Sequence, residues 1–188
     1  MGSLGSKTVN DKIVTFLNDF KNKEYQVLFV TGNSYYESVK NLKVPSNVII
    51  KPFIYELPAL MKVSDLIITR AGASTMSEIL VLGLPAIFIP SPYVTNNHQY
   101  KNAAVLAKAG AAVLVAEKEL SSERIVSEVR TLVENTQKRA ELEARIRNFA
   151  DADTSKCVFR ELVHLVGDNR LCLSEEDEKA LGEAVAVL

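Results

Sequence analysis

The chain has 188 residues, of which 47% are hydrophobic and 24% charged, the composition of an ordinary globular domain with one full core. Its net charge of −1 excludes a general attraction to nucleic acid or anionic lipid, although the net charge does not reveal a local basic patch. No apolar run reaches the roughly 18 residues that a membrane-spanning helix needs, and no secretory signal is visible. We expect a cytoplasmic protein without a nucleic-acid partner, for which peripheral contact with a membrane stays open.

Five short apolar segments, rich in β-branched residues and bounded by turn residues, predict strands that are buried on both faces. They are 25–31, 47–51, 65–69, 85–89 and 111–116. Helical patterns lie before, between and after them, at 7–21, 74–82, 97–109, 121–135 and 137–150. Strand alternating with helix predicts an α/β fold with a Rossmann-like, doubly wound parallel sheet.

The domain organisation follows from where this alternation stops. We interpret residues 1–166 as one domain and residues 167–188 as a tail or an extra helix of unknown role.

Gly83 and Gly110 stand where helices should end, and Ser121 is the predicted N-cap of the next helix. Cys157 and Cys172 are far apart and show no metal-ligand spacing, so we expect reduced thiols and no metal.

Ligands of doubly wound sheets bind beyond the carboxyl ends of the strands, and the segment Arg70–Glu78 directly follows a predicted strand. Gly72 permits a tight turn into a helix whose first N–H groups suit a diphosphate. The N–H and hydroxyl donors of this turn belong to Ala73, Ser74 and Thr75. Glu78 can accept hydrogen bonds from ribose hydroxyls, although a plain capped turn with Glu78 in solvent explains the segment equally.

Three other segments are weaker candidates for the same edge. Gly2-Ser3-Leu4-Gly5 precedes a helix and suits a phosphate, but the same residues resemble a cloning scar. Phe53-Ile54 suits a base, or simple loop packing. The loop 90–102 holds His98 and Gln99, which can bind sugar hydroxyls or merely face solvent.

Together these segments resemble the C-terminal domain of the MurG family of N-acetylglucosaminyltransferases. The resemblance covers about residues 2–166 and includes the turn Arg70–Glu78, Gly83–Pro90 and the run from Gln99 to Ala103. It implies the C-terminal half of a GT-B glycosyltransferase, two Rossmann-like domains around a cleft. It also implies UDP-N-acetylglucosamine as the donor, a lipid-linked muramoyl-pentapeptide as the acceptor, and work at the cytoplasmic face of the bacterial membrane.

Carried over by position, the resemblance assigns roles to individual residues. Ser3 and the turn Ala73–Thr75 meet the diphosphate, and Ile54 meets the uracil through its backbone. Glu78 meets the ribose, and Gln99 meets the N-acetylglucosamine hydroxyls. The flanking residues of these motifs are further candidates: Gly2, Gly5, Arg70, Gly72 and His98. The family uses no tightly held metal or cofactor, and its catalytic base is expected in the N-terminal domain.

Two departures from the family pattern bear on function. His98 stands where some members carry a second glutamine. No strand precedes Gly2, although the first strand of a Rossmann-like sheet is central. Its neighbours would keep unpaired backbone groups in the core, each costing on the order of 1–3 kcal/mol. We expect this chain alone to be weakly stable, or to associate through exposed edges, and to catalyse no transfer.

Two other functions stay open. One is a related lipid glycosyltransferase with another acceptor, such as diacylglycerol. The other is a nucleotide-sugar-binding subunit of a split glycosyltransferase, completed by a separate polypeptide. An NAD-binding domain is disfavoured, because no complete GxGxxG motif follows a predicted strand.

Overall fold

The computed structural model describes residues 6–21, 24–150 and 162. The chain divides into two compact units, residues 1–149 and 150–188, and every strand and helix given below belongs to the first. The predicted tail at 167–188 and the predicted boundary at residue 166 lie outside the described residues. None of the helices among the described residues is both long and apolar enough to cross a bilayer.

Strands and helices alternate along the first unit, as the sequence predicts. The strands are β1 Val27–Val30, β2 Val48–Lys51, β3 Ile67–Thr69, β4 Ala86–Phe88 and β5 Val113–Leu114. The helices are α1 Lys7–Thr15, α2 Asn33–Val39, α3 Leu57–Lys62, α4 Ala73–Leu82, α5 His98–Lys108, α6 Ser122–Glu134 and α7 Thr136–Arg147. Short 3-10 turns lie at Leu17–Phe20, Thr95–Asn97 and Glu117–Glu119. Each predicted strand and helix within the described residues is confirmed, and α2 and α3 are additions.

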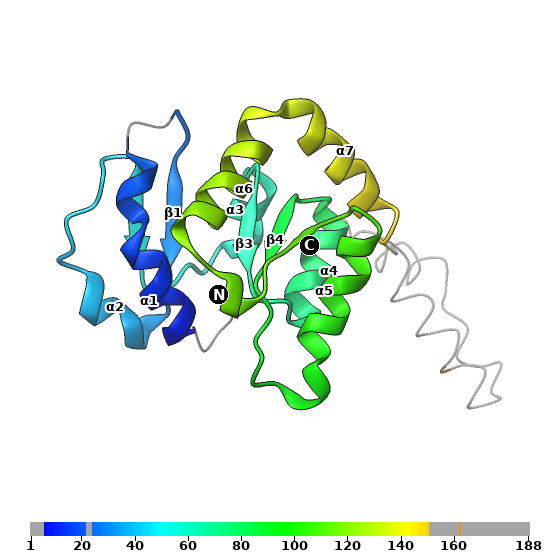
Figure 1. Ribbon diagram of the computed structural model, residues 1–188, viewed down its shortest axis with the longest axis horizontal. Coiled ribbons are helices and arrows are strands. Elements are labelled where there is room, and N and C mark those ends of the chain that lie inside the picture. Colours follow the sequence, from blue (N-terminus) through cyan, green and yellow to red (C-terminus); the bar gives the residue numbers. More distant parts are fainter. Residues whose placement is uncertain (1–5, 22–23, 151–161, 163–188) are drawn as a thin grey trace, which may run out of the picture. The chain divides into compact units, whose positions relative to one another are not determined.

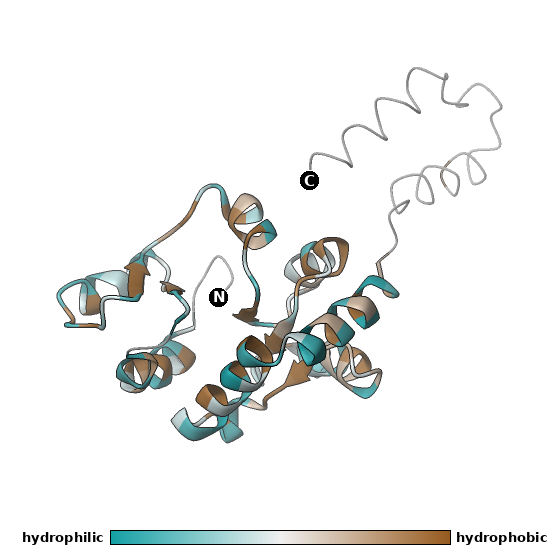
Figure 2. Cartoon of the chain, turned by 90° about the horizontal axis from the view of Figure 1, so that it is seen from above, coloured by the Kyte–Doolittle hydropathy of each residue, from teal (hydrophilic) through white to brown (hydrophobic). Residues whose placement is uncertain are grey.

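The five strands are all parallel, but they form two sheets in the described part of the chain. β1 pairs with β2 in one sheet, and the second sheet has the order β3-β4-β5 (Figure 1). β4 is the best-covered strand, with Ile87 and Phe88 fully buried, and the strands are the most apolar part of the fold (Figure 2). β1 and β3 are edge strands of the two sheets and do not pair with each other in the described part of the chain.

Helix packing and a few polar contacts join the two sheets. α1 and the turn that follows it pack on α6, burying Phe16 and Leu17. The Lys12 ammonium donates to the carbonyl groups of Glu117 at 2.9 Å and Leu120 at 3.3 Å. These contacts link α1 to the segment after β5, although the two sheets do not pair directly.

The helix ends follow the predicted chemistry. The Ser121 hydroxyl accepts a hydrogen bond from the Arg124 N–H at 3.2 Å, which makes Ser121 the N-cap of α6. Gly83 ends α4 with a φ of +65°, and Gly110 follows α5 with a φ of +66°. Such left-handed backbone is costly for any residue that has a Cβ.

We expect Gly83→Ala to destabilise the fold by about 1 kcal/mol or more, because φ is positive there. A Cβ at this position would also meet the Arg147 side chain at 2.7 Å. Urea unfolding followed by circular dichroism measures the change. The matched control is Val81→Ala on the same helix, where the side chain is 47% exposed and a change within about 0.5 kcal/mol is expected. Equal stability of the two variants would contradict the assignment of the left-handed helix end.

Candidate functional site

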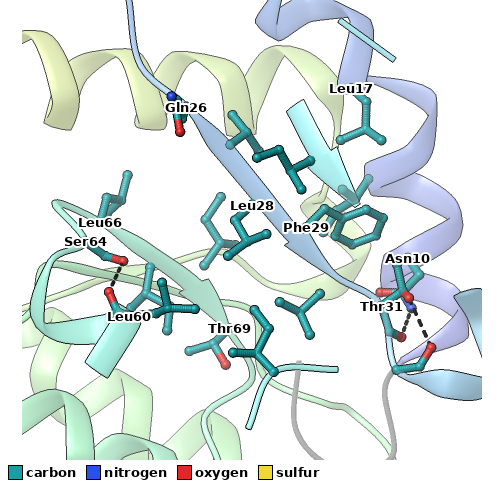
Figure 3. Close-up of a pocket in the computed structure, with 18 of the residues that line it drawn as sticks. Asn10, Leu17, Gln26, Leu28, Phe29, Thr31, Leu60, Ser64, Leu66 and Thr69 are labelled. Atoms are coloured by element: carbon teal, nitrogen blue, oxygen red, sulfur yellow. Dashed lines mark hydrogen bonds between the residues drawn. The ribbon is translucent and has the colours of Figure 1, made fainter. Parts of the chain in front are cut away.

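A cavity of about 1850 Å³ runs along β1 and β3 and reaches the carboxyl ends of β1, β2 and β3. Its wall includes Thr31 and Gly32 after β1, the segment 52–54 after β2, and Thr69 at the end of β3 (Figure 3). Three of the predicted site residues line it together: Ile54, Thr75 and Glu78. The structure therefore brings one residue predicted for the base, one for the diphosphate and one for the ribose to the wall of one cavity.

The turn from β3 into α4 leaves its first N–H groups without intrahelical partners. Gly72 is the N-cap residue and has no side chain to occupy them, and the first backbone bond of the helix runs from Met76 N–H to the Gly72 carbonyl at 2.9 Å. Ala73 and Ser74 are exposed at this end, and Thr75 is half-buried. Positive partial charge and free donors are thus open to an anion.

Gly72 has neither a positive φ nor a crowded Cβ position. Its φ of −71° suits any residue, and a Cβ built on it would meet nothing within 4 Å. Neither backbone strain nor crowding within the described protein calls for a glycine here. The open space in front of it admits the close approach of a ligand to the backbone, which a Cβ would hinder.

The loop after β2 presents apolar side chains beside the turn. Phe53 and Tyr55 form an edge-to-face pair with ring centroids 5.1 Å apart, although their side chains are 49% and 88% exposed. Ile54 lies between them in sequence, is half-buried, and lines the cavity. The loop therefore offers an apolar surface and free backbone groups at the position predicted for a base.

Gln99 and His98 stand apart from this wall, on the first turn of α5. The Ser91 N–H donates to the Gln99 side-chain oxygen at 2.9 Å, which fixes the amide against the loop after β4. The His98 Nδ1 lies 2.9 Å from the Thr95 carbonyl, and the ring is exposed. Neither residue lines the cavity, so their predicted contact with a sugar stays a prediction.

Arg70 contacts residues that are far from it in the sequence. Its guanidinium donates to the Ile89 carbonyl at 3.0 Å and to the Ser6 hydroxyl at 2.6 Å. It also lies 2.6 Å from a carboxylate oxygen of Glu117, and the two side chains are only 11% and 8% exposed. Arg70 thus ties the first residue before α1 to the ends of β3 and β4. These contacts make it a positioning residue in the described protein.

Two residues of this site escaped the sequence interpretation. Glu117 directly follows the apolar run 111–116, and the position of an acid at the end of a buried strand is the available signal. Asn10 is fully buried on α1 and donates to the Thr31 carbonyl at 2.9 Å, which holds the helix start against the end of β1. The predicted phosphate loop itself, Gly2, Ser3 and Gly5, lies outside the described residues.

Two tyrosines on the cavity wall have raised pKa values. Burial, then the hydrogen bond to Asp11 at 2.6 Å, raises the pKa of Tyr35 to about 12. Burial, then the carboxylate of Glu134, raises the pKa of Tyr25. Both hydroxyls therefore stay protonated near neutral pH, and that of Tyr35 donates to the Asp11 carboxylate.

Comparison with known proteins places this geometry in a family. The model of the glycosyltransferase family 28 C-terminal domain matches residues 1–157. A UDP-N-acetylglucosamine–N-acetylmuramyl-(pentapeptide) pyrophosphoryl-undecaprenol N-acetylglucosamine transferase from Halalkalibacterium halodurans is 49% identical over 132 residues, 68% of this chain and 36% of the relative. Such a transferase from Bacillus cereus is 39% identical over 169 residues, 88% of this chain and 46% of the relative.

Solved structures agree with this placement. MurG of Acinetobacter baumannii matches with a TM-score of 0.72 and 29% identity, covering 84% of this chain and 46% of that one. The glycosyltransferase VinC, solved with dTDP, matches with a TM-score of 0.62, covering 75% of this chain and 34% of that one. Its 21% identity makes it evidence for the fold alone.

The fold and the site define a Rossmann-like domain of the glycosyltransferase type. The chain belongs to glycosyltransferase family 28 and corresponds to its C-terminal domain. This confirms the resemblance and the fold class inferred from the sequence. The chain spans 36–46% of the length of the relatives described above.

We expect Arg70→Met to destabilise the fold by about 3–5 kcal/mol, because it leaves the Glu117 carboxylate buried and unpaired. Urea unfolding measures the loss. The double variant Arg70→Met, Glu117→Met removes both charges and should recover part of that stability. A double variant that loses the sum of the two single losses would show that the pair is not coupled.

Proposed function

We propose that this domain binds UDP-N-acetylglucosamine as the donor half of a glycosyltransferase. The observation that carries the proposal is the convergence of Ile54, Thr75 and Glu78 on one cavity beside the uncapped start of α4. A nucleoside diphosphate needs an apolar surface for its base, a hydrogen-bond acceptor for its ribose and amide donors for its phosphates. In our proposal Ile54 provides the apolar surface, Glu78 the acceptor and the turn at Thr75 the amide donors.

The donor and the acceptor that we propose for the whole protein follow from the names of the relatives, and the reaction follows from the family resemblance. The 4-hydroxyl of a lipid-linked muramoyl-pentapeptide attacks the anomeric carbon of the sugar, the configuration inverts, and UDP departs. Fixed amides at the turn into α4 would stabilise the leaving diphosphate without a metal or other cofactor. Ser3 and Gln99 would add contacts to the phosphate and to the sugar.

The remaining roles would belong to the part of the relatives that this chain does not match. The acceptor site and the catalytic base would lie in an N-terminal domain, and the complete protein would work at the cytoplasmic face of the bacterial membrane. We propose no transfer by this chain alone. Purified chain that converts a lipid-linked muramoyl acceptor in the presence of UDP-N-acetylglucosamine would overturn this part of the proposal.

Gly72→Ala tests the diphosphate position. We expect about tenfold weaker binding of UDP, because a Cβ would hold the phosphate away from the amides, equivalent to about 1.4 kcal/mol. Thermal stability should stay unchanged or rise slightly, since φ is ordinary and the space is open. Isothermal titration calorimetry and a thermal melt give the two readouts. Unchanged affinity in a folded Gly72→Ala variant would contradict the assignment.

Glu78→Gln tests the ribose position. A hydrogen bond to a charged group contributes about 1.5–3 kcal/mol, so we expect UDP affinity to fall about tenfold or more. Glu134→Gln is the matched control, because Glu134 is also an exposed glutamate on a helix but does not line the cavity. Calorimetry with UDP should show a loss in the first variant only. Equal affinities in the two variants would exclude Glu78 from the site.

A donor panel tests the sugar. We expect UDP-N-acetylglucosamine to compete for the site better than UDP-glucose or UDP-galactose, and Gln99→Ala to reduce that preference. Competition against a fluorescent UDP derivative measures it. A preference for UDP-glucose or UDP-galactose would favour the related lipid glycosyltransferase instead.

A further inference from the structure

We propose that the loop between β4 and α5 is a preset support for the donor sugar, with Ser91, Asn96 and Asn97 as its positioning residues. Together they hold the Gln99 side chain with its amide nitrogen turned toward the sugar. The inference rests on the proposed function, because it takes a sugar nucleotide to be bound at the turn into α4. It adds to that function the residues that set the sugar preference.

The loop lies beside the turn that we assign to the diphosphate. β3 and β4 are neighbours in one sheet, with Thr69 opposite Phe88, so the chain leaves both strands at the same edge. The Ile89 N–H donates to the Thr69 carbonyl at 2.8 Å, which continues this pairing to the first residue of the loop. The chain then projects beyond the sheet before it returns as α5 (Figure 1). A sugar linked to a diphosphate at the turn therefore has this loop as its neighbour on the β4 side.

Arg70 fixes the base of the loop relative to the turn. It follows β3 and comes two residues before Gly72, and its guanidinium donates to the Ile89 carbonyl at 3.0 Å. Pro90, the next residue, is buried. A shift of the loop base would break a contact of a buried charge, which is costly. The turn and the loop base therefore form one rigid frame.

The loop also fixes the direction of the Gln99 amide. Pro90 and Pro92 have no N–H group, so the backbone donor of this short segment belongs to Ser91. The Ser91 N–H donates to the Gln99 side-chain oxygen at 2.9 Å. An amide whose oxygen is engaged in this way presents its two N–H donors at the other end. Gln99 therefore meets a ligand as a hydrogen-bond donor, which suits the oxygen atoms of a sugar.

Two left-handed asparagines bring the chain back from the loop to Gln99. Asn96 has a φ of +54° and Asn97 a φ of +52°, and they are the non-glycine residues with positive φ in the described part of the chain. Both are exposed, and Asn97 makes no side-chain capping bond although it is the N-cap residue of α5. Asparagine tolerates left-handed backbone better than most residues do. The backbone that asparagine permits therefore explains the residue type at both positions.

Two hydrogen bonds close the turn that these asparagines form. The Asn97 N–H donates to the Val94 carbonyl at 3.1 Å, and the His98 Nδ1 lies 2.9 Å from the Thr95 carbonyl. Since a carbonyl only accepts, the His98 contact is a hydrogen bond when Nδ1 carries the proton. α5 therefore begins at a fixed point, one residue before Gln99.

The first test separates backbone from side chain at the two asparagines. One variant of the full chain carries Asn96→Ala and Asn97→Ala, and another carries Asn96→Gly and Asn97→Gly. Calorimetry gives the ratio of the Kd for UDP to the Kd for UDP-N-acetylglucosamine, which isolates the contribution of the sugar. We expect this ratio to fall about fivefold or more with alanine, which disfavours left-handed backbone, and to stay within about twofold with glycine. The Kd for UDP alone should stay within about twofold in both variants, because the turn into α4 is unchanged.

Amide exchange at Ser91 gives a second readout that needs no ligand. Exchange should be slow in the parent chain and in the glycine variant. It should be about fivefold faster or more in the alanine variant, because the Gln99 oxygen then leaves the Ser91 N–H. Asn148→Ala is the matched control, because Asn148 is also exposed but has a φ of −68°, which alanine adopts freely. Neither readout should change in this control.

The pair Ser91→Ala and Ser91→Pro tests the backbone donor. Both variants lose the hydroxyl that accepts from the Tyr93 N–H at 3.3 Å, and they differ in the N–H group of residue 91. The residue before a proline already favours extended backbone, so a further proline fits there. We expect the Kd ratio to fall about fivefold in Ser91→Pro and to stay within about twofold in Ser91→Ala.

The outcomes distinguish this inference from the proposed function. Equal losses in the alanine and glycine variants would mean that the asparagine side chains contact the sugar directly, and would overturn the positioning role. Unchanged ratios in both variants would overturn it as well. A parent chain that binds neither ligand would overturn the proposed function and with it the sugar role, whereas exchange at Ser91 would still decide whether the asparagines hold Gln99.

Discussion

The structure depends on one buried guanidinium. Arg70 stands where β3 ends, and its contacts reach Ser6 before α1, the carbonyl of Ile89 after β4, and Glu117 after β5. A buried charge is tolerated only when it is paired and hydrogen-bonded. Moving any of these groups away from the guanidinium would therefore cost free energy. The carboxyl edge of the sheet, where ligands of this fold bind, is organised around that point.

The same contacts explain how α1 keeps its place although the sheet is divided. Its start is fixed by Arg70 through Ser6 and by Asn10 through Thr31, and its middle by Lys12 on the carbonyl groups of Glu117 and Leu120. The polar contacts define position, and packing on α6 supplies the apolar burial. α1 thus forms one boundary of the cavity.

The sequence predicts the elements well where a physical signal is local. Buried parallel strands are continuous apolar runs, and Gly83 and Ser121 mark helix ends by backbone and capping chemistry. α3 has six residues, too few for a helical period to emerge, so it was missed. The pairing of Arg70 with Glu117 was missed because it joins positions 47 apart in sequence, and only folding brings them together. The motif is enough to select Gln99 as a candidate. The sequence does not predict that Gln99 lies outside the lining of the cavity.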